Sequence, residues 1–137
     1  MKTTTDATNM QYAVIEGVSF GILDGVNSIL KVNDNFEKVF MVGGGSRSSF
    51  WIELIASLLE RNLSVCDQSE YGAALGVARL AMHVDKNIQD RNNIIKEIKI
   101  SKEYKPKLDR ADLLKKRYKI WKDLYSSNKK IAPTLLA

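Results

Sequence analysis

A short apolar run followed by three consecutive glycines constrains this chain more than any other feature. The apolar residues are 39–42, the glycines are 43–45, and an amphipathic helical pattern begins just after them. This order predicts a strand, a tight turn and a helix with Ser48 or Ser49 as its N-cap. Glycine lacks a Cβ and tolerates positive φ, so a ligand can approach such a turn closely. The unpaired N–H groups at the start of the helix point back toward the same place.

Two interpretations of this turn remain open on the segment alone. It is neither the GxxxxGK[ST] phosphate loop nor the full GxGxxG dinucleotide fingerprint. The segment alone therefore fits two interpretations equally well. One is a nucleotide-binding turn, and the other is an ordinary strand-to-helix turn whose glycines serve only the geometry.

The first helix is expected over residues 6–30, with Asp6 as its N-cap. Its apolar residues recur at spacings of seven, four and three, as one buried face would. Its glycines recur every four residues and predict a stripe where another backbone packs closely. The expected buried face consists of Ile15, Ile22, Val26 and Ile29, and the expected stripe of Gly17, Gly21 and Gly25.

The remaining pattern alternates helices and short strands, which indicates an α/β layer. The expected strands are 38–42 and 63–66, and the expected helices are 49–61, with Phe50, Leu54 and Leu58 on one side, and 71–83. Residues 85–107 are less regular, with a short helix near Asp90 and an extended piece at 98–100. After Pro106, a final helix capped by Asp109 is expected to end near Ser126, with Leu114, Tyr118, Trp121 and Tyr125 as its apolar stripe.

Three blocks carry a resemblance to a known family: AVIEGVSFGILDGV (13–26), KVFMVGGGSRSSFWIELIA (38–56) and EYGAALGVARLA (70–81). In order and spacing they resemble the C-terminal domain of the FGGY family of carbohydrate kinases, and within it the xylulose kinases most nearly. The tail RYKIWKDLY (117–125) resembles the family's closing helix. The matching positions are Ala13, Glu16, Gly17 and Phe20, then Gly43, Gly44, Gly45, Ser48, Trp51 and Ala56, then Glu70, Ala74, Leu75, Gly76 and Ala78.

The resemblance implies a partial actin-like ATPase, or ribonuclease H-like, C-terminal domain, rich in helices and with a few short strands. It also implies that the glycine turn binds the adenosine end of ATP. The nucleotide-binding residues would then be Gly43, Gly44, Gly45 and Ser46. The Mg²⁺ that accompanies ATP would be held by residues outside this chain. Arg47 is expected either to reach phosphates or to be an ordinary surface arginine.

We expect residues 1–137 to form one incomplete domain: a glycine-loop core over 1–84, a basic helical extension over 85–128 and a tail over 129–137. The resemblance implies an ATP-dependent sugar kinase whose sugar site and catalytic base lie in an N-terminal domain. The isolated chain is therefore expected to be inactive. The alternative is a non-catalytic interaction module derived from such a kinase. Strands without neighbours leave an open sheet edge, so a homo-oligomer or a partner chain is expected.

Four positions depart from the family pattern: Tyr12, Glu53, Ser57 and Glu60. Glu60 occupies a position that the family often gives to Asn or Gly and that can touch adenine. Glu16 and Glu70 match acidic family positions and are interpreted as structural rather than metal-binding.

The distribution of charge bears on whether this chain binds nucleic acid. Residues 1–84 hold six Lys and Arg against nine Asp and Glu, a net charge of −3, whereas residues 85–137 hold fifteen against seven, a net +8. The basic charges lie around helices and mix with acids, so a solvated face is expected rather than a nucleic-acid site.

Cys66, the single cysteine, is expected to be a buried structural thiol, and His83, the single histidine, to face solvent. The sequence shows no secretory signal and no apolar run that predicts a membrane span, so a cytoplasmic location is expected.

Overall fold

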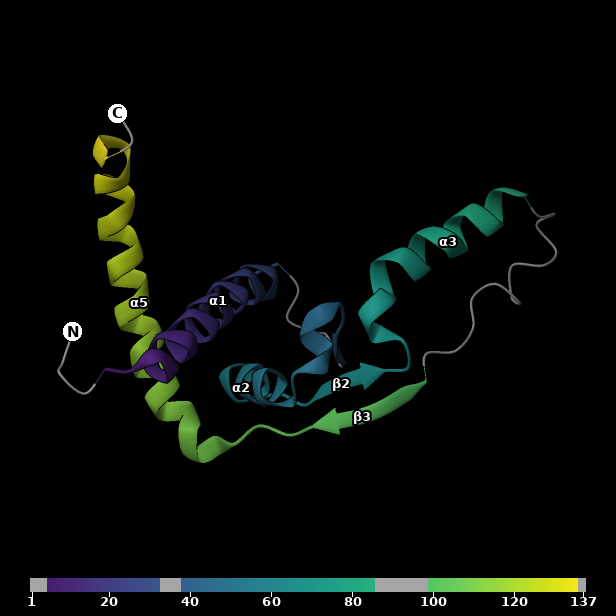
Figure 1. Ribbon diagram of the computed structural model, residues 1–137, viewed down its shortest axis with the longest axis horizontal. Helices are drawn as coiled ribbons and strands as arrows, with labels where there is room; N and C mark the ends of the chain where they lie inside the picture. The colour runs from purple at the N-terminus through teal and green to yellow at the C-terminus, as the bar shows by residue number, and fades with distance from the viewer. Residues whose placement is uncertain (1–4, 33–37, 86–98, 136–137) are drawn as a thin grey trace.

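The computed structural model describes residues 5–32, 38–85 and 99–135, with side chains described to residue 82 in the third helix and residue 129 in the last one (Figure 1). The short helix expected near Asp90 and the surroundings of the His83 side chain lie outside the described part. The elements in chain order are α1 (Ala7–Leu30), β1 (Val39–Met41), the 3-10 turn η1 (Gly44–Arg47), α2 (Ser49–Leu59), β2 (Leu63–Cys66), the 3-10 turn η2 (Ser69–Tyr71), α3 (Gly72–Asp85), β3 (Ile100–Tyr104) and α5 (Leu108–Leu135).

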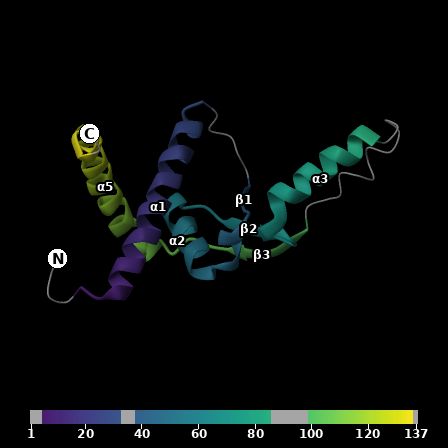
Figure 2. The ribbon, with the colours of Figure 1, turned by 45° about the horizontal axis from the view of Figure 1, so that its top comes forward.

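The strands form one mixed sheet in the order β1-β2-β3. β1 and β2 are parallel, with Val39 opposite Leu63, and α2 makes the connection between them. β3 is antiparallel to β2, with a register shift between Val65 and Cys66. Helices α1, α2 and α5 gather on one side of the molecule, whereas α3 extends away on the other (Figures 1 and 2). The expected α/β architecture, helix-rich with a few short strands, is confirmed.

The hydrophobic core has two parts that meet at α2. One cluster joins α1, α2 and α5 and consists of Phe20, Leu23, Leu54, Leu58 and Leu114. The other joins α2 to the sheet and consists of Ile52, Ile55, Ala56 and Leu63. Trp51 and Leu59 pack against both clusters. α2 is therefore the central element, and its mostly apolar sequence follows from burial on two sides.

The start of α1 agrees with the prediction, because the Asp6 carboxylate accepts a hydrogen bond from the Asn9 N–H at 2.8 Å. The predicted buried face is correct only in part, because Ile15 packs against the core and Val26 is half-buried, but the other two residues are exposed. Ile22 is 37% exposed and Ile29 60% exposed. The buried positions of α1 are Glu16, Ser19, Phe20 and Leu23. Two of these are polar and have partners on other helices, so hydrophobic periodicity alone could not locate this face.

The glycine stripe of α1 does not pack against another backbone in the described structure. A Cβ at Gly17 would lie 3.8 Å from the indole nitrogen of Trp121, which is ordinary contact with a side chain. A Cβ at Gly21 or Gly25 would meet nothing within 4 Å among the described residues. The expectation of close backbone packing is therefore wrong for the part of the molecule described here.

The expectation that no apolar run could span a bilayer needs correction for α1. This helix has 24 residues, and an 18-residue window within it has a mean hydropathy of 1.4. By length and composition alone it could cross a membrane, a criterion that core helices of soluble proteins also meet. The buried Glu16 of α1 contacts α5, so one face of the helix packs against protein.

The C-terminal part contains more regular structure than expected. The extended piece continues as β3 to Tyr104, and α5 continues to Leu135, so residues 129–135 are helical rather than a frayed tail. Asp109 lies in the first turn of α5 instead of preceding it. The expected stripe holds in part: Leu114 is buried and Tyr118 and Trp121 pack against the core, but Tyr125 is 57% exposed. The basic side chains of α5 that lie on the surface include Lys115, Lys116, Lys119 and Lys122.

Candidate functional site

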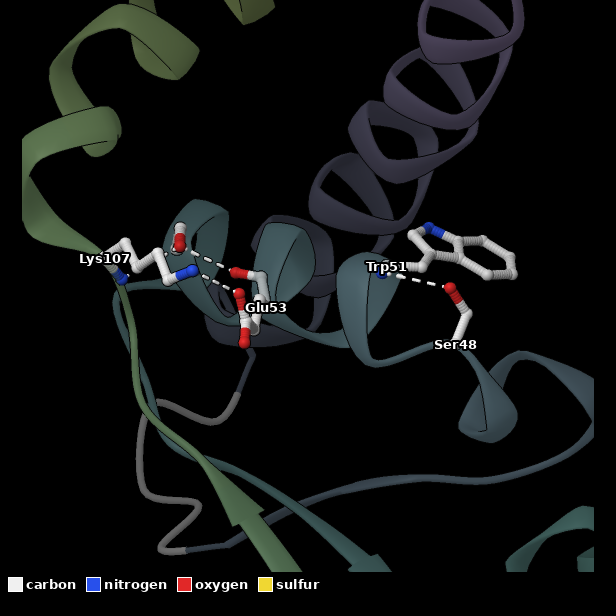
Figure 3. Close-up of polar contacts among 5 residues, drawn as sticks. Ser48, Trp51, Glu53 and Lys107 are labelled. Atoms are coloured by element: carbon white, nitrogen blue, oxygen red, sulfur yellow. Dashed lines mark hydrogen bonds and ion pairs between the residues drawn. The ribbon is translucent and has the colours of Figure 1, made fainter.

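The glycine turn lies at the carboxyl end of β1. Gly43 has φ +81° and ψ −171°, a conformation that a residue with a Cβ rarely adopts. Residues Gly44–Arg47 then form one 3-10 turn, and α2 starts at Ser49. The Ser48 hydroxyl accepts a hydrogen bond from the Trp51 N–H at 3.3 Å (Figure 3), so Ser48, one of the two predicted N-caps, has this role.

The other two glycines serve different purposes. A Cβ at Gly45 would lie 2.8 Å from the Met41 Cε and 2.8 Å from the Trp51 Cζ3, so this glycine is required by packing. A Cβ at Gly44 would meet nothing within 4 Å among the described residues. Gly44 therefore faces open space, and its missing side chain leaves bare backbone at the surface of the turn.

This difference gives a prediction about stability. Gly45→Ala is expected to lower the free energy of unfolding by about 1–3 kcal/mol, because the added methyl group must displace packed side chains. Gly44→Ala is expected to change it by less than about 1 kcal/mol, because the new methyl group meets no neighbour. Urea unfolding followed by circular dichroism measures both. Equal losses from the two variants would contradict this assignment of the glycines.

A second loop holds the glycine turn in place. The Gly43 N–H donates to the Ser69 carbonyl at 2.8 Å. The Ser69 hydroxyl donates to the Ser46 hydroxyl at 2.9 Å, and the Ser46 hydroxyl donates to the Gly43 carbonyl at 2.7 Å. Ser69 is 7% exposed. Sequence reasoning did not single out Ser69, and the only signal near it was the family position matched by its neighbour Glu70.

The same two loops are joined by an ion pair between Arg47 and Glu70. The hydrogen bond from Arg47, followed by one with Tyr71, holds the pKa of the Glu70 carboxyl below its usual range. The Arg47 side chain is 69% exposed, so solvent screens the pair. Glu70 thus has a structural contact, in agreement with its interpretation as a residue that ties loops together, and Arg47 is a surface arginine with a carboxylate partner.

Three of the four departures from the family pattern contact the C-terminal part of the chain. The Glu53 carboxylate pairs with the Lys107 ammonium (Figure 3), and the Ser57 hydroxyl accepts from the Lys107 backbone N–H at 2.9 Å. The Glu60 carboxylate pairs with the Lys115 ammonium at 2.7 Å. All three side chains therefore connect α2 to α5 or to the segment leading into it.

Glu60 has a backbone conformation that Asn and Gly adopt more readily than Glu. It is the C-cap of α2 and has φ 52° and ψ 35°, the left-handed conformation in which helices commonly end. The glycine turn lies at the opposite end of this 11-residue helix, roughly 16 Å away at 1.5 Å per residue. Whether the Glu60 carboxylate lies near adenine therefore stays a prediction.

The remaining departure, Tyr12, and the family position Glu16 lie together on α1. Tyr12 packs edge-on against Phe50, with ring centroids 6.0 Å apart, and burial raises the pKa of its phenol. Phe50, expected on the packed side of α2, is 45% exposed. The buried Glu16 carboxylate pairs with the Arg117 guanidinium at 2.9 Å, which ties α1 to α5. Both residues serve packing between helices rather than the glycine turn.

A cavity of about 550 Å³ lies at the carboxyl ends of the parallel strands β1 and β2, and Gly43, Gly44, Gly45 and Ser46 are not among its lining residues. Ligands of open α/β sheets bind at this edge. Its lining residues are Phe40, Val42, Cys66, Asp67, Gln68, Ser69, Gly72, Leu75, Gly76, Arg79 and Lys99. Cys66 is half-buried rather than buried, and desolvation, followed by the charge of Asp67, raises the pKa of its thiol. The thiol is therefore not activated as a nucleophile.

No group of three or more His, Cys, Asp or Glu side chains that could hold a metal ion occurs in residues 5–32, 38–85 and 99–135.

The parallel strands β1 and β2, connected through the glycine turn and α2, form a small α/β unit, and the solved structures that it matches have the actin-like ATPase fold. Solved structures agree with this fold. The chain aligns with a xyloylose kinase from Brucella ovis at a TM-score of 0.77 and 24% identity, covering 96% of this chain and 27% of that one. It aligns with a xylulose kinase from Rhodospirillum rubrum at 0.73 and 16%, covering 96% and 27%.

Sequence comparison gives the family. The C-terminal domain of the FGGY family of carbohydrate kinases matches residues 1–84. The chain therefore belongs to the FGGY family of carbohydrate kinases, as its three sequence blocks predicted. It is 24% identical to a xylulose kinase of Staphylococcus epidermidis over 125 residues and 26% identical to that of Escherichia coli over 113 residues. These matches cover 90% and 82% of this chain but only 25% and 23% of the relatives. The chain thus spans about a quarter of their length.

Proposed function

We propose that this chain supplies the nucleotide side of an ATP-dependent sugar kinase of the xylulose kinase type, with Gly43, Gly44, Gly45 and Ser46 as the wall against the nucleoside. The observation that carries the proposal is the open space at Gly44. The residues on either side are constrained, because Gly43 has a positive φ and Gly45 is closely packed. Without a side chain at Gly44, the backbone can approach the flat face of an adenine or ribose closely. Such a face needs close contact more than it needs a charged partner.

The rest of the reaction would use groups outside this chain. Mg²⁺ would accompany ATP and bind to residues elsewhere in the kinase, and the sugar would bind to an N-terminal domain. The similarity to xylulose kinases favours xylulose as the sugar and the cytoplasm as the compartment.

A calorimetric titration with MgATP and MgADP tests the nucleotide wall. Gly44→Val is expected to weaken binding at least tenfold, because the new side chain fills the space that the nucleoside needs, while the protein stays folded. Gly21→Val is the matched control, since Gly21 also has an open environment but lies on α1. Equal affinities for Gly44→Val and the unaltered chain would contradict the proposal.

We also propose that these 137 residues do not transfer a phosphoryl group by themselves. Phosphoryl transfer needs a positioned acceptor and neutralised charge around the γ-phosphate. An assay of xylulose-dependent ADP release is expected to give only the background rate, and to give turnover after an N-terminal half of a xylulose kinase is added. Turnover by the chain alone would overturn this.

The alternative function is a non-catalytic module that associates with another chain. Among the described residues β1 pairs only with β2, so its outer edge is free to pair. The exposed apolar residues of α3 include Val77, Leu80 and Met82. A homo-oligomer or a complex with a partner chain would cover both features. Light scattering that gives the mass of a monomer at all concentrations would count against self-association.

A further inference from the structure

We propose that Ser46 presents a hydrogen-bond acceptor to the bound nucleotide, so that it selects a nucleoside N–H or O–H group rather than a phosphate, and that Ser69 is the positioning residue that orients it. The proposal rests on the proposed function of the glycine turn and deepens it. It assigns a specific contact to one hydroxyl and a role to a residue outside the turn.

The partners of the Ser46 and Ser69 hydroxyl groups determine where their protons lie. A serine hydroxyl has one proton to donate and two lone pairs to accept with. The Gly43 carbonyl can only accept, so the proton in its 2.7 Å contact comes from Ser46. The proton in the 2.9 Å contact between the two hydroxyls must then come from Ser69. The resulting relay runs from Ser69 to Ser46 to the Gly43 carbonyl.

The relay leaves Ser46 with one free lone pair and no free proton. Ser46 is half-buried and so partly open to solvent, whereas Ser69 is 7% exposed. Phosphate oxygens are acceptors and would face an oxygen that has no proton for them. The adenine amino group and the ribose hydroxyls can donate, and these are the groups that the geometry favours at Ser46.

Neighbouring groups support a nucleoside rather than a phosphate at this turn. The backbone N–H groups of Gly43, Ser46 and Ser48 already donate to the carbonyls of Ser69, Gly43 and Gly45. The Arg47 guanidinium pairs with the Glu70 carboxylate. Phosphate is bound by free backbone N–H groups, and these three N–H groups are used within the protein.

The test compares the affinities of ATP analogues for the unaltered chain and for Ser46→Ala, measured by titration calorimetry. The analogues are purine riboside triphosphate, which lacks the amino group, 2′-deoxy-ATP and 3′-deoxy-ATP, and the phosphate-only probe is tripolyphosphate. The unaltered chain is expected to bind ATP roughly 3–10-fold more tightly than the analogue without the contacted donor. Ser46→Ala should abolish this preference, and Ser46→Thr, which keeps the hydroxyl, should restore it.

Further variants test the role of Ser69, and several outcomes would contradict the inference. Ser69→Ala is expected to lower the affinity for ATP and reduce the preference, while Ser49→Ala, a control on an exposed serine outside the relay, should change neither. If Ser46→Ala weakens every nucleotide equally, Ser46 is merely structural and the inference is wrong. Tripolyphosphate that binds as tightly as ATP and loses affinity in Ser46→Ala also contradicts it. Failure of the unaltered chain to bind any nucleotide would instead contradict the proposed function, and the inference with it.

Discussion

Phe20→Ala is expected to lower the free energy of unfolding by about 3–5 kcal/mol. Phe20 is 3% exposed and lies where α1, α2 and α5 meet. Its ring lies 5.7 Å from that of Tyr118 and 6.1 Å from that of Trp121, measured between centroids. Because a domain of this size is stable by only about 5–15 kcal/mol, this loss removes a large share of the total stability.

Urea unfolding followed by tryptophan fluorescence measures this effect. Val18→Ala is the matched control, because Val18 lies two residues away on the same helix and is 50% exposed. It should change stability by less than about 0.5 kcal/mol. A similar small effect from Phe20→Ala would show that α1 is not held by this cluster.

Arg117→Met is expected to destabilise the protein by about 2–3 kcal/mol. Glu16 has a side chain only 7% exposed, and its Oε1 has no hydrogen-bond partner among the described residues. Removing the guanidinium leaves a buried carboxylate unpaired, which costs about 3–5 kcal/mol for a fully buried pair. The Arg117 side chain is 44% exposed, so we expect a smaller value.

A second substitution separates charge from packing. Glu16→Gln added to Arg117→Met should recover part of the lost stability, because an amide is cheaper to bury than an unpaired carboxylate. Lys116→Met, on an exposed position of α5, should have little effect. If the double variant is no more stable than Arg117→Met alone, packing of the arginine rather than the ion pair explains the loss.

The local elements of the fold could be predicted because their signals are local. Asp6 and Ser48 cap α1 and α2 through hydrogen bonds to residues three positions later. The run of glycines marks the end of β1, and Gly43 has the positive φ that the pattern suggested. Alternation of helices and strands indicated the α/β class, and the three blocks indicated the family.

The buried faces could not be predicted because they depend on contacts distant in sequence. Glu16 and Ser19 are polar, and they are buried because Arg117 and Trp51 supply partners. The apolar residues Ile22 and Ile29, by contrast, are exposed. Periodicity assumes that apolar residues define the buried face, and α1 does not follow this rule.

The candidate site could be predicted in its position but not in its organisation. The three glycines can be identified from the sequence, but the sequence does not distinguish them. The structure shows that Gly43 has a positive φ, that Gly45 is required by packing and that Gly44 faces open space. Ser69 lies 23 residues from Ser46, and nothing in the sequence connects the two hydroxyls. The relay between them is a tertiary feature.

The most direct test of the nucleotide wall is hydrogen exchange of the backbone amides, compared with and without saturating MgATP. Our account predicts slower exchange at residues 43–48 and 69–72, and unchanged exchange across α5. Gly44→Val should show no such protection at the same ATP concentration. Unchanged exchange at the glycine turn of the unaltered chain, or protection confined to the basic helix α5, would contradict the account.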